Sequence, residues 1–155
     1  MTEGTPSGTR VLIVQVQAGS CALPLMHVTE TMRPLPIESI ACALPFVRGI
    51  SIIRGAPTPV VDLGVLLGTS DGAPGRFVTL RLGGRQVALS VNAVEGIRAL
   101  DALTLQRLPP LLHGVSQEII EAIGTLDEQM LIVLRSGWQL PESVWQAVAA
   151  REVAQ

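Results

Sequence analysis

Short apolar runs of strand length alternate with turn residues along most of the chain. One pair of runs is VLIVQV at 11–16 and CAL at 21–23, and a second pair, FVTLRL at 77–82 and RQVALSV at 85–91, flanks Gly83-Gly84. Runs of about four to eight residues that are rich in Val, Leu and Ile are typical of β-strands, and a Gly-Gly connection favours a hairpin. The pattern therefore predicts a mainly β chain built from hairpins.

The two hairpins align with each other. Ala22-Leu23 falls on Ala88-Leu89 when the second hairpin is laid over the first without a gap, and the stretch from Ile52 to Val61 has a looser counterpart within 119–134. Such self-similarity indicates a duplicated supersecondary module. Several short strands with regular turns favour small barrels or sandwiches over a parallel sheet with crossover helices. We therefore expect two small β-barrel-like subdomains whose cores are shared or abut.

One domain preceded by a tail is expected. Residues 1–9 are small and polar and are predicted to form a flexible tail, which leaves 10–155 as a single domain. Its expected parts are a first barrel over about 10–68 with return elements, a second barrel over about 76–136, and a C-terminal helix over about 140–153. The helix is predicted because Pro141 suits a first helical turn and apolar residues follow it at helical spacing.

Composition and charge narrow the classes of partner. The 155 residues are 48% hydrophobic and 3% aromatic, with 11 basic and 13 acidic residues and a net charge of −2. The chain has no block of like charge, so nucleic-acid binding is not predicted. It also has no uninterrupted apolar window of about 18 residues, so membrane insertion is not predicted. The first ten residues lack the features of a secretory signal, so a cytoplasmic protein is expected. All basic residues are Arg, which excludes Schiff-base chemistry on lysine and a P-loop lysine.

Few residues that carry catalysis or bind metals occur together. Cys21 and His27 pair a nucleophile with a base, but Cys21 falls in an expected strand and no orienting acid accompanies it. The only other cysteine and histidine are Cys42 and His113. The chain has no Cys-x-x-Cys spacing of the kind that indicates a zinc site. Asp127-Glu128 is expected to form a hairpin turn. We therefore expect no catalytic residue, no metal site and no cofactor.

The segment FVRGISIIRGAPTPVVDL, at 46–63, places two arginines inside an apolar run. Arg48 and Arg54 are an even number of residues apart, so a regular strand would project both from one face, with Ile50 and Ile52 between them. Two interpretations stay open. Either the arginine stems cover apolar surface while the guanidinium groups stay in water, or this face meets another protein, because interfaces are enriched in Arg beside apolar anchors.

The second half of this segment predicts a strand boundary and a helix start. Pro57 and Pro59 have no N–H to donate, which marks an edge strand or the beginning of a strand. Asp62 precedes LGVLLG, and its side chain is expected to cap a short helical turn. Leu66 and Leu67 in that turn are expected to anchor it in the core.

The same segment resembles the region of CheW-like domains that combines a basic-Gly pair, a Leu-Arg-Gly stretch and Pro-apolar-apolar-Asp-Leu. The likeness extends to ALPLMHVTE at 22–30, VALSVNAVEGI at 87–97 and AIGTLDEQMLIVL at 122–134, and so covers nearly the whole chain from Val11 onward. The resemblance implies two SH3-like five-stranded β-barrels around a shared apolar core, with a C-terminal helix. It also implies a non-enzymatic adaptor of bacterial chemotaxis, which couples the cytoplasmic tips of chemoreceptors to the regulatory domain of a histidine kinase.

The resemblance also assigns a binding surface, residue by residue. The receptor-facing groove would contain Leu25, Val28, Glu30, Ile50 and Arg54, with Arg54 as the polar anchor and Arg48 nearby, whereas kinase contact would use exposed loops and apolar edges. Three residues depart from the family pattern: Thr31, where an apolar residue is more usual, Ile53, where Asn is common, and Asn92, where Asp is common. We expect these departures to affect the choice of receptor and the strength of kinase activation rather than the fold.

A second class of function stays open beside the adaptor. A small-ligand sensor or an enzyme would use the crevice between the two barrels. A deep polar pocket containing Cys21 or His27 would favour that class, whereas burial of these side chains in a dry core would count against it. The adaptor hypothesis instead predicts a cytoplasmic protein, recruited to receptor arrays, that neither binds nucleic acid nor inserts into a membrane.

Overall fold

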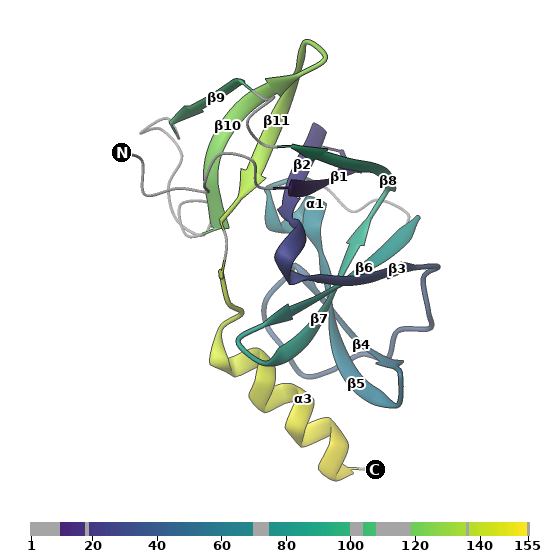
Figure 1. Ribbon diagram of the computed structural model, residues 1–155. Helices are drawn as coiled ribbons and strands as arrows, with labels where there is room; N and C mark the ends of the chain where they lie inside the picture. Colours follow the sequence, from purple (N-terminus) through teal and green to yellow (C-terminus); the bar gives the residue numbers. More distant parts are fainter. Residues whose placement is uncertain are drawn as a thin grey trace.

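The computed structural model describes residues 10–17, 19–69, 75–99, 104–107, 119–135 and 137–154. These residues form two β-sheets, with short helical turns between some of the strands and a long helix at the C-terminal end (Figure 1). The predicted tail at 1–9 and the position of His113 lie outside the described residues. In the part of the chain described, no helix has the length and apolar character needed to cross a bilayer.

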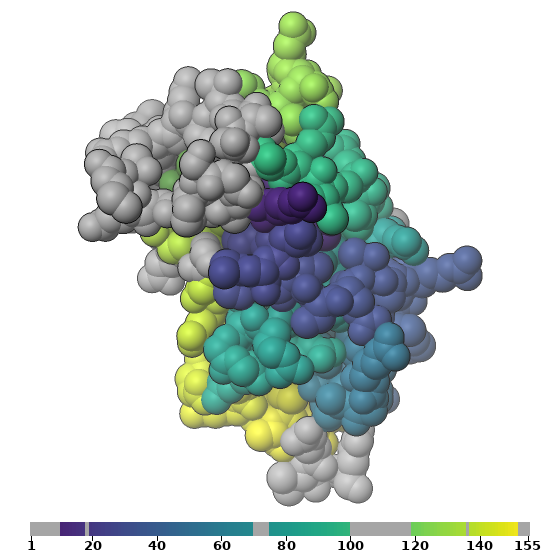
Figure 2. Space-filling model, viewed as in Figure 1, coloured from purple at the N-terminus to yellow at the C-terminus, as the bar shows by residue number. Residues whose placement is uncertain are grey.

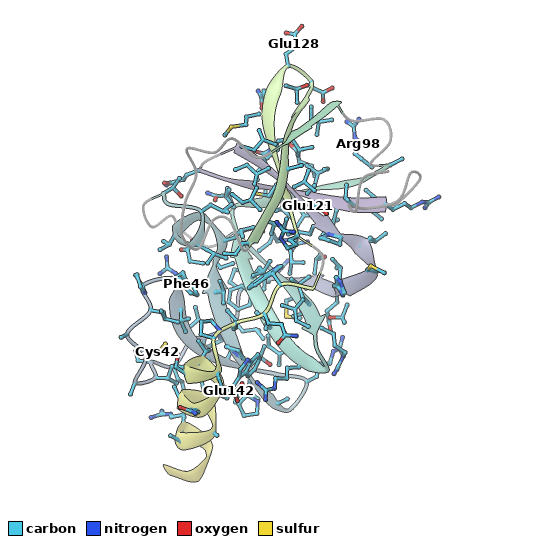
Figure 3. The ribbon with its side chains drawn as sticks, turned by 90° about the vertical axis from the view of Figure 1, so that its left-hand side faces the viewer. Cys42, Phe46, Arg98, Glu121, Glu128 and Glu142 are labelled. Atoms are coloured by element: carbon cyan, nitrogen blue, oxygen red, sulfur yellow. The ribbon has the colours of Figure 1, made fainter. Side chains whose placement is uncertain are left out.

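The first sheet has six strands in the order β8-β1-β2-β11-β10-β9. Their bounds are β1 Arg10–Val16, β2 Gly19–Pro24, β8 Ala93–Ala99, β9 Thr104–Arg107, β10 Ile120–Leu126 and β11 Gln129–Leu134. The β2–β11 pair is parallel and the other neighbours are antiparallel. The tight turn at Asp127-Glu128 joins β10 to β11, as the sequence predicted, and Figure 3 shows Glu128 at the tip of this hairpin.

The second sheet has five strands in the order β3-β6-β7-β5-β4. Their bounds are β3 Val28–Met32, β4 Val47–Ile53, β5 Ala56–Asp62, β6 Arg76–Leu82 and β7 Arg85–Val91. The 3-10 turn η1, Leu25–His27, connects β2 to β3, and the short helix α1, Leu63–Leu66, follows β5. Here too one central pair, β5–β7, is parallel.

The strand orders reveal the duplication that the sequence pattern predicted. If β1-β2 corresponds to β6-β7, β3 to β8, and β4-β5 to β10-β11, then β8-β1-β2-β11-β10 matches β3-β6-β7-β5-β4 strand for strand. Each sheet therefore joins the first hairpin of one repeat to the later strands of the other. The mainly β fold with two sheets and a C-terminal helix is confirmed, and β9 is an additional sixth strand in one sheet.

Each sheet combines strands from the predicted first barrel, over about 10–68 with return elements, and from the predicted second barrel, over about 76–136. The strand that follows each first hairpin, β3 or β8, crosses to the opposite sheet. Two similar repeats offer equivalent pairing edges, so local sequence does not distinguish pairing within a repeat from pairing between repeats. Among the described residues no strand pair links the two ends of either sheet, so the strand orders are those of open sheets.

Proline marks the beginning of β5 rather than an edge strand. Pro57 and Pro59 pair with Ile52 and Ile50 of β4, whereas the pairing of β5 with β7 begins only at Val60. β5 is thus a central strand whose first residues lack a neighbour on the β7 side. The missing N–H groups fall where this ladder has not yet started.

The largest apolar cluster lies between the sheets, and two smaller clusters lie within them. In β1, Leu12 and Val14 belong to the shared cluster, whereas Val11 and Ile13 belong to the cluster of the six-stranded sheet. β1 is therefore buried on both faces, which explains its continuous apolar sequence. The shared core that was predicted is present.

The C-terminal helix α3, Glu142–Ala154, packs on the five-stranded sheet. Val144 on its inner face is fully buried in the shared core. At its first turn, which Figure 3 labels at Glu142, the Arg85 guanidinium donates to the Glu142 carboxylate at 3.2 Å and lies 4.8 Å from the centre of the Trp145 ring. Apolar burial and these surface contacts together hold α3 on the domain.

Candidate functional site

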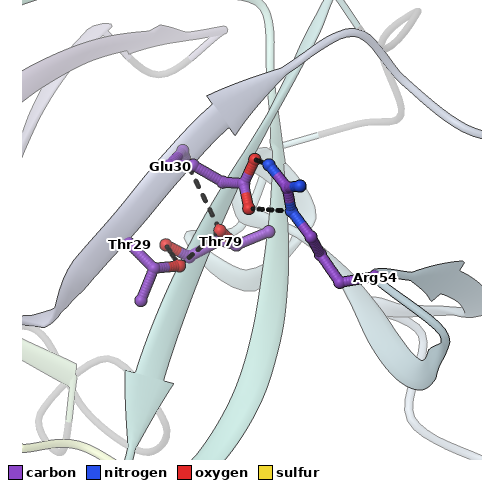
Figure 4. Close-up of polar contacts among 4 residues, drawn as sticks. All are labelled: Thr29, Glu30, Arg54 and Thr79. Atoms are coloured by element: carbon purple, nitrogen blue, oxygen red, sulfur yellow. Dashed lines mark hydrogen bonds and ion pairs between the residues drawn. The ribbon is translucent and has the colours of Figure 1, made fainter.

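Arg54 and Glu30 form a two-pronged ion pair on the protein surface (Figure 4). Arg54 Nε donates to Glu30 Oε2 at 3.0 Å, and Nη2 donates to Oε1 at 2.9 Å. Arg54 lies in the turn between β4 and β5, and Glu30 lies on β3. Because β3 and β4 are the two edges of the five-stranded sheet, this pair spans the open side of that sheet. The structure thus brings together two residues that the family resemblance assigned to the binding groove.

Arg54 adopts a backbone conformation that few arginines adopt. Its φ of 54° is in the left-handed region, and Gly55 follows with a φ of 79°. Successive positive φ angles are what a tight two-residue hairpin turn requires, and Gly or Asn usually occupies the first of these positions. An arginine here projects from the tip of the hairpin, and its side chain is 75% exposed.

The position of Glu30 depends on two threonines. Thr79 Oγ1 donates to the Glu30 carbonyl oxygen at 3.3 Å, and Thr29 Oγ1 donates to the Thr79 carbonyl oxygen at 3.1 Å (Figure 4). The β3–β6 register shifts between Val28 and Glu30, so this part of β3 is a bulge that the threonines support. Hydrogen bonds from Arg54 and its positive charge lower the pKa of the Glu30 carboxyl. Both side chains are therefore charged at neutral pH.

Apolar side chains precede both members of the ion pair along the chain. Leu25 and Val28 are half-buried and pack against the shared core, and Ile52 on β4 is 52% exposed. On the face shown in Figure 2, the dark blue residues of β3 and the lighter blue residues of the β4–β5 hairpin form one continuous surface. We call Leu25, Val28, Glu30, Ile52 and Arg54 the edge surface.

Ile50 does not belong to the edge surface, because only 1% of it is exposed. Its N–H donates to the Glu38 carbonyl oxygen, and the Glu38 N–H donates to the Ile50 carbonyl oxygen, each at 2.8 Å. The segment that follows β3 thus pairs with β4 at Ile50 and leaves Ile52 exposed further along the strand. Strand periodicity places Ile50 and Ile52 on one face, but it does not show that another segment pairs there.

Arg48 is the extra residue of a β-bulge and pairs with Asp62. Val47 is opposite Val61 and Gly49 is opposite Val60, which leaves Arg48 between them without an opposite residue. Its Nη2 and Nε donate to Asp62 Oδ2 at 2.6 and 3.1 Å. The expectation that Arg48 and Arg54 share one strand face required a regular strand, and the bulge and the turn remove that condition.

Asp62 caps α1 as the sequence predicted. Its Oδ1 accepts a hydrogen bond from the Val65 N–H at 3.0 Å. Leu66 is buried and Leu67 packs against the shared core, so the turn is anchored as expected.

The three departures from the family pattern have different environments. Ile53 is 1% exposed and packs with Phe77 in the core of the five-stranded sheet, which accounts for an apolar residue there. Thr31 and Asn92 are exposed, and the Asn92 N–H donates to the Gln15 carbonyl oxygen at 2.8 Å. These placements leave the fold unaffected.

The one candidate for a nucleophile is buried. Cys21 lies within the shared core, where burial raises the pKa of its thiol to about 12. A thiolate is therefore essentially absent at neutral pH, and no substrate reaches the sulfur. Within the described part of the chain no three His, Cys, Asp or Glu side chains cluster so as to hold a metal ion. The enzyme hypothesis therefore loses its nucleophile, whereas its proposed base, His27, is half-buried in η1.

The structure defines a class of protein, a small β-domain whose surface suits protein binding. Its two interleaved sheets enclose a shared core, and charged and apolar side chains are exposed where the edges of one sheet approach each other. The model of the CheW-like domain matches residues 10–137, and the chain belongs to that family.

Known proteins similar to this chain agree with the family. The chain is 25% identical over 134 residues to a chemotaxis protein CheW from Klebsiella aerogenes, which covers 84% of this chain and 81% of the relative. A chemotaxis protein CheW from Treponema pallidum is 24% identical over 119 residues, covering 72% and 70% of the two chains. The crystal structure of the scaffolding protein TtCheW from Thermoanaerobacter tengcongensis superimposes with a TM-score of 0.70 at 22% identity, covering 83% of this chain and 89% of the other, and so supports the fold.

Proposed function

We propose that this protein is a non-enzymatic, cytoplasmic adaptor that couples the cytoplasmic tips of chemoreceptors to the regulatory domain of a chemotaxis histidine kinase. Membership of the CheW-like family supports a chemotaxis scaffold. The observation that carries the finer assignment is the exposed Arg54–Glu30 ion pair beside Val28 and Ile52.

The edge surface suits a helical partner. An amphipathic helix would lay its apolar side chains on Val28 and Ile52, while Arg54 fixes its orientation through an acidic or carbonyl group. Arg54 is already held in position by Glu30, so less side-chain entropy is lost when the partner binds. This recognition mode needs no cofactor, metal or catalytic residue.

Three variants test whether Arg54 contacts the partner. Arg54→Glu reverses the exposed charge, and the double variant Arg54→Glu with Glu30→Arg reverses the charge but keeps an ion pair within the protein. Arg81→Glu is the matched control, because Arg81 is exposed on β6, where its Nη1 donates to the Gly84 carbonyl oxygen. Each purified variant is mixed with membranes that contain receptor and kinase, and the bound fraction is measured by co-sedimentation.

We expect Arg54→Glu and the double variant to lose co-sedimentation and Arg81→Glu to retain it, because a reversed charge at an interface repels the partner. Recovery of binding in the double variant would mean that Arg54 serves only the ion pair. Failure of the wild-type protein to co-sediment with receptor or kinase would refute the proposed function itself.

A further inference from the structure

Thr79 is a polar residue at a fully buried position of the five-stranded sheet. It follows Phe77 by two residues on β6, so both side chains project from the same face of the strand. Phe77 packs there in an apolar cluster with Ala88, the residue opposite Thr79 on β7. A buried hydroxyl is unfavourable unless it forms hydrogen bonds, and a Val of the same shape would avoid this cost. The hydroxyl of Thr79 therefore needs an explanation other than packing.

The Thr79 hydroxyl bonds to two neighbouring residues of β3 (Figure 4). Its Oγ1 donates to the Glu30 carbonyl oxygen at 3.3 Å and lies 2.5 Å from the Thr29 Oγ1. The Thr29 Oγ1 also lies 3.1 Å from the Thr79 carbonyl oxygen, to which it donates. The two threonines thus fasten the middle of β3 to β6 through their side chains.

These hydrogen bonds lie at a bulge where β3 changes the face on which its side chains project. Val28 is opposite Leu80 and Glu30 is opposite Thr79, which leaves Thr29 as the extra residue. Opposite residues on neighbouring strands project from the same face of a sheet, so Val28 shares the face of Leu80 and Glu30 shares that of Thr79. In a regular strand Val28 and Glu30 would project from one face. The bulge therefore determines where the Glu30 side chain lies.

The position of Glu30 in turn determines the orientation of Arg54. Both Glu30 carboxylate oxygens accept from the Arg54 guanidinium, at 3.0 and 2.9 Å, and a two-pronged contact of this kind fixes the plane of the guanidinium. The Arg54 side chain is 75% exposed and that of Glu30 is 31% exposed. A chain of contacts therefore runs from a buried hydroxyl to an exposed arginine.

We propose that Thr29 and Thr79 are positioning residues, whose paired hydroxyls hold the β3 bulge and so fix the orientation in which Arg54 meets a receptor tip. This inference rests on the proposed adaptor function. Thr79 is 0% exposed, so it acts on the receptor only through Glu30 and Arg54. Holding Arg54 in one orientation before binding lowers the side-chain entropy that is lost on association.

Variants of Thr79 separate the hydroxyl from the packing of the side chain. Thr79→Val keeps the shape and removes the hydroxyl, whereas Thr79→Ser keeps the hydroxyl and removes a methyl group. Thr29→Val removes the second hydroxyl. Thr69→Val is the control, because the Thr69 Oγ1 also donates to a backbone carbonyl, that of Gly64 at 2.7 Å, but in α1. Each variant is measured for the free energy of unfolding in urea, the pKa of the Glu30 carboxyl by NMR, and the affinity for a soluble receptor-tip fragment by calorimetry.

We expect Thr79→Val and Thr29→Val to raise the pKa of the Glu30 carboxyl toward its ordinary value, because the hydrogen bonds from Arg54 that lower this pKa would weaken. Affinity for the receptor tip should fall about three- to tenfold, the range for ordering one long side chain. Thr79→Ser and Thr69→Val should lose stability but keep the wild-type pKa and affinity. A merely structural role would lower stability in all four variants and leave the pKa and the affinity unchanged.

A wild-type pKa of Glu30 in folded Thr79→Val would overturn the positioning role, and so would equal changes in Thr79→Val and Thr79→Ser. A raised pKa with unchanged affinity would overturn the claim that this orientation serves receptor binding. If Thr79→Val does not fold, Thr29→Val decides by the same measurements. These outcomes leave the adaptor function standing, whereas absence of binding by the wild-type protein to the receptor-tip fragment would overturn the adaptor function and this proposal together.

Discussion

Alkaline pH is expected to destabilise this protein through one buried thiol. Burial raises the pKa of Cys21 from its ordinary value of 9.0 to about 12. The chain contains no Tyr, and all of its basic residues are Arg, so the cysteines are the only side chains whose ordinary pKa values lie between pH 8 and 11. The stability of the protein in this range therefore reports mainly on its thiols.

The direction follows from which state loses its proton first. Above pH 9 the thiol of Cys21 ionises in the unfolded chain but stays protonated in the folded protein, so alkali favours unfolding. The contribution of Cys21 is fully present below pH 9 and is lost as the pH rises toward 12. With these two pKa values, the free energy of unfolding falls by roughly 1 kcal/mol at pH 10 and by roughly 3 kcal/mol at pH 11.

Urea unfolding followed by tryptophan fluorescence measures this loss. Trp138 is buried and Trp145 half-buried, so their emission reports on the packing around α3. The free energy of unfolding is determined at pH 8, 10 and 11 with a reducing agent, for the wild type, Cys21→Ala and Cys42→Ala. Cys42→Ala is the matched control, because Cys42 is only half-buried.

Cys21→Ala should be less stable at pH 8, since it leaves a small cavity in the core, but it should lose less stability as the pH rises. Cys42→Ala should retain the steep pH dependence of the wild type. Parallel pH profiles for the wild type and Cys21→Ala would refute the reasoning, and so would rapid modification of two thiols per folded molecule by a thiol reagent at pH 8.

Three further predictions concern the bulge, the ion pair and the helix. Gly49→Ala should destabilise the protein by about 3 kcal/mol or more in urea unfolding, because its φ is +145° and a Cβ would lie 2.1 Å from the Glu38 carbonyl oxygen; a loss below 1 kcal/mol would contradict this. NMR titration should give the Glu30 carboxyl a pKa below the ordinary value of a glutamate, and this pKa should move back toward the ordinary value in Arg54→Gln. The contribution of the ion pair to stability should therefore be lost as the pH falls through the lowered pKa. Val144→Ala should lower the free energy of unfolding by about 2 kcal/mol, because it removes buried apolar volume, and an unchanged unfolding midpoint would show that α3 does not depend on this contact.

Local patterns determined much of this fold in advance. The hairpins at β1–β2 and β6–β7, the cap at Asp62 and the helix near Pro141 all follow from periodicity, turn residues and capping within a few positions of each other. The alignment of Ala22-Leu23 with Ala88-Leu89 also indicated the duplication that the strand orders display. Resemblance to the CheW-like family named Glu30 and Arg54, which the structure joins as an ion pair.

The remaining features depend on contacts between distant parts of the chain. A ten-residue segment of the sequence does not predict three features of the structure. These are the exchange of β3 and β8 between sheets, the burial of Ile50 where it pairs with Glu38, and the bulge at Arg48. Sequence by itself determined which segments are strands and which faces are apolar, because side-chain alternation is local. Only the tertiary structure decided which edge each strand joins and which carboxylate each arginine meets, because these choices depend on the whole packed arrangement.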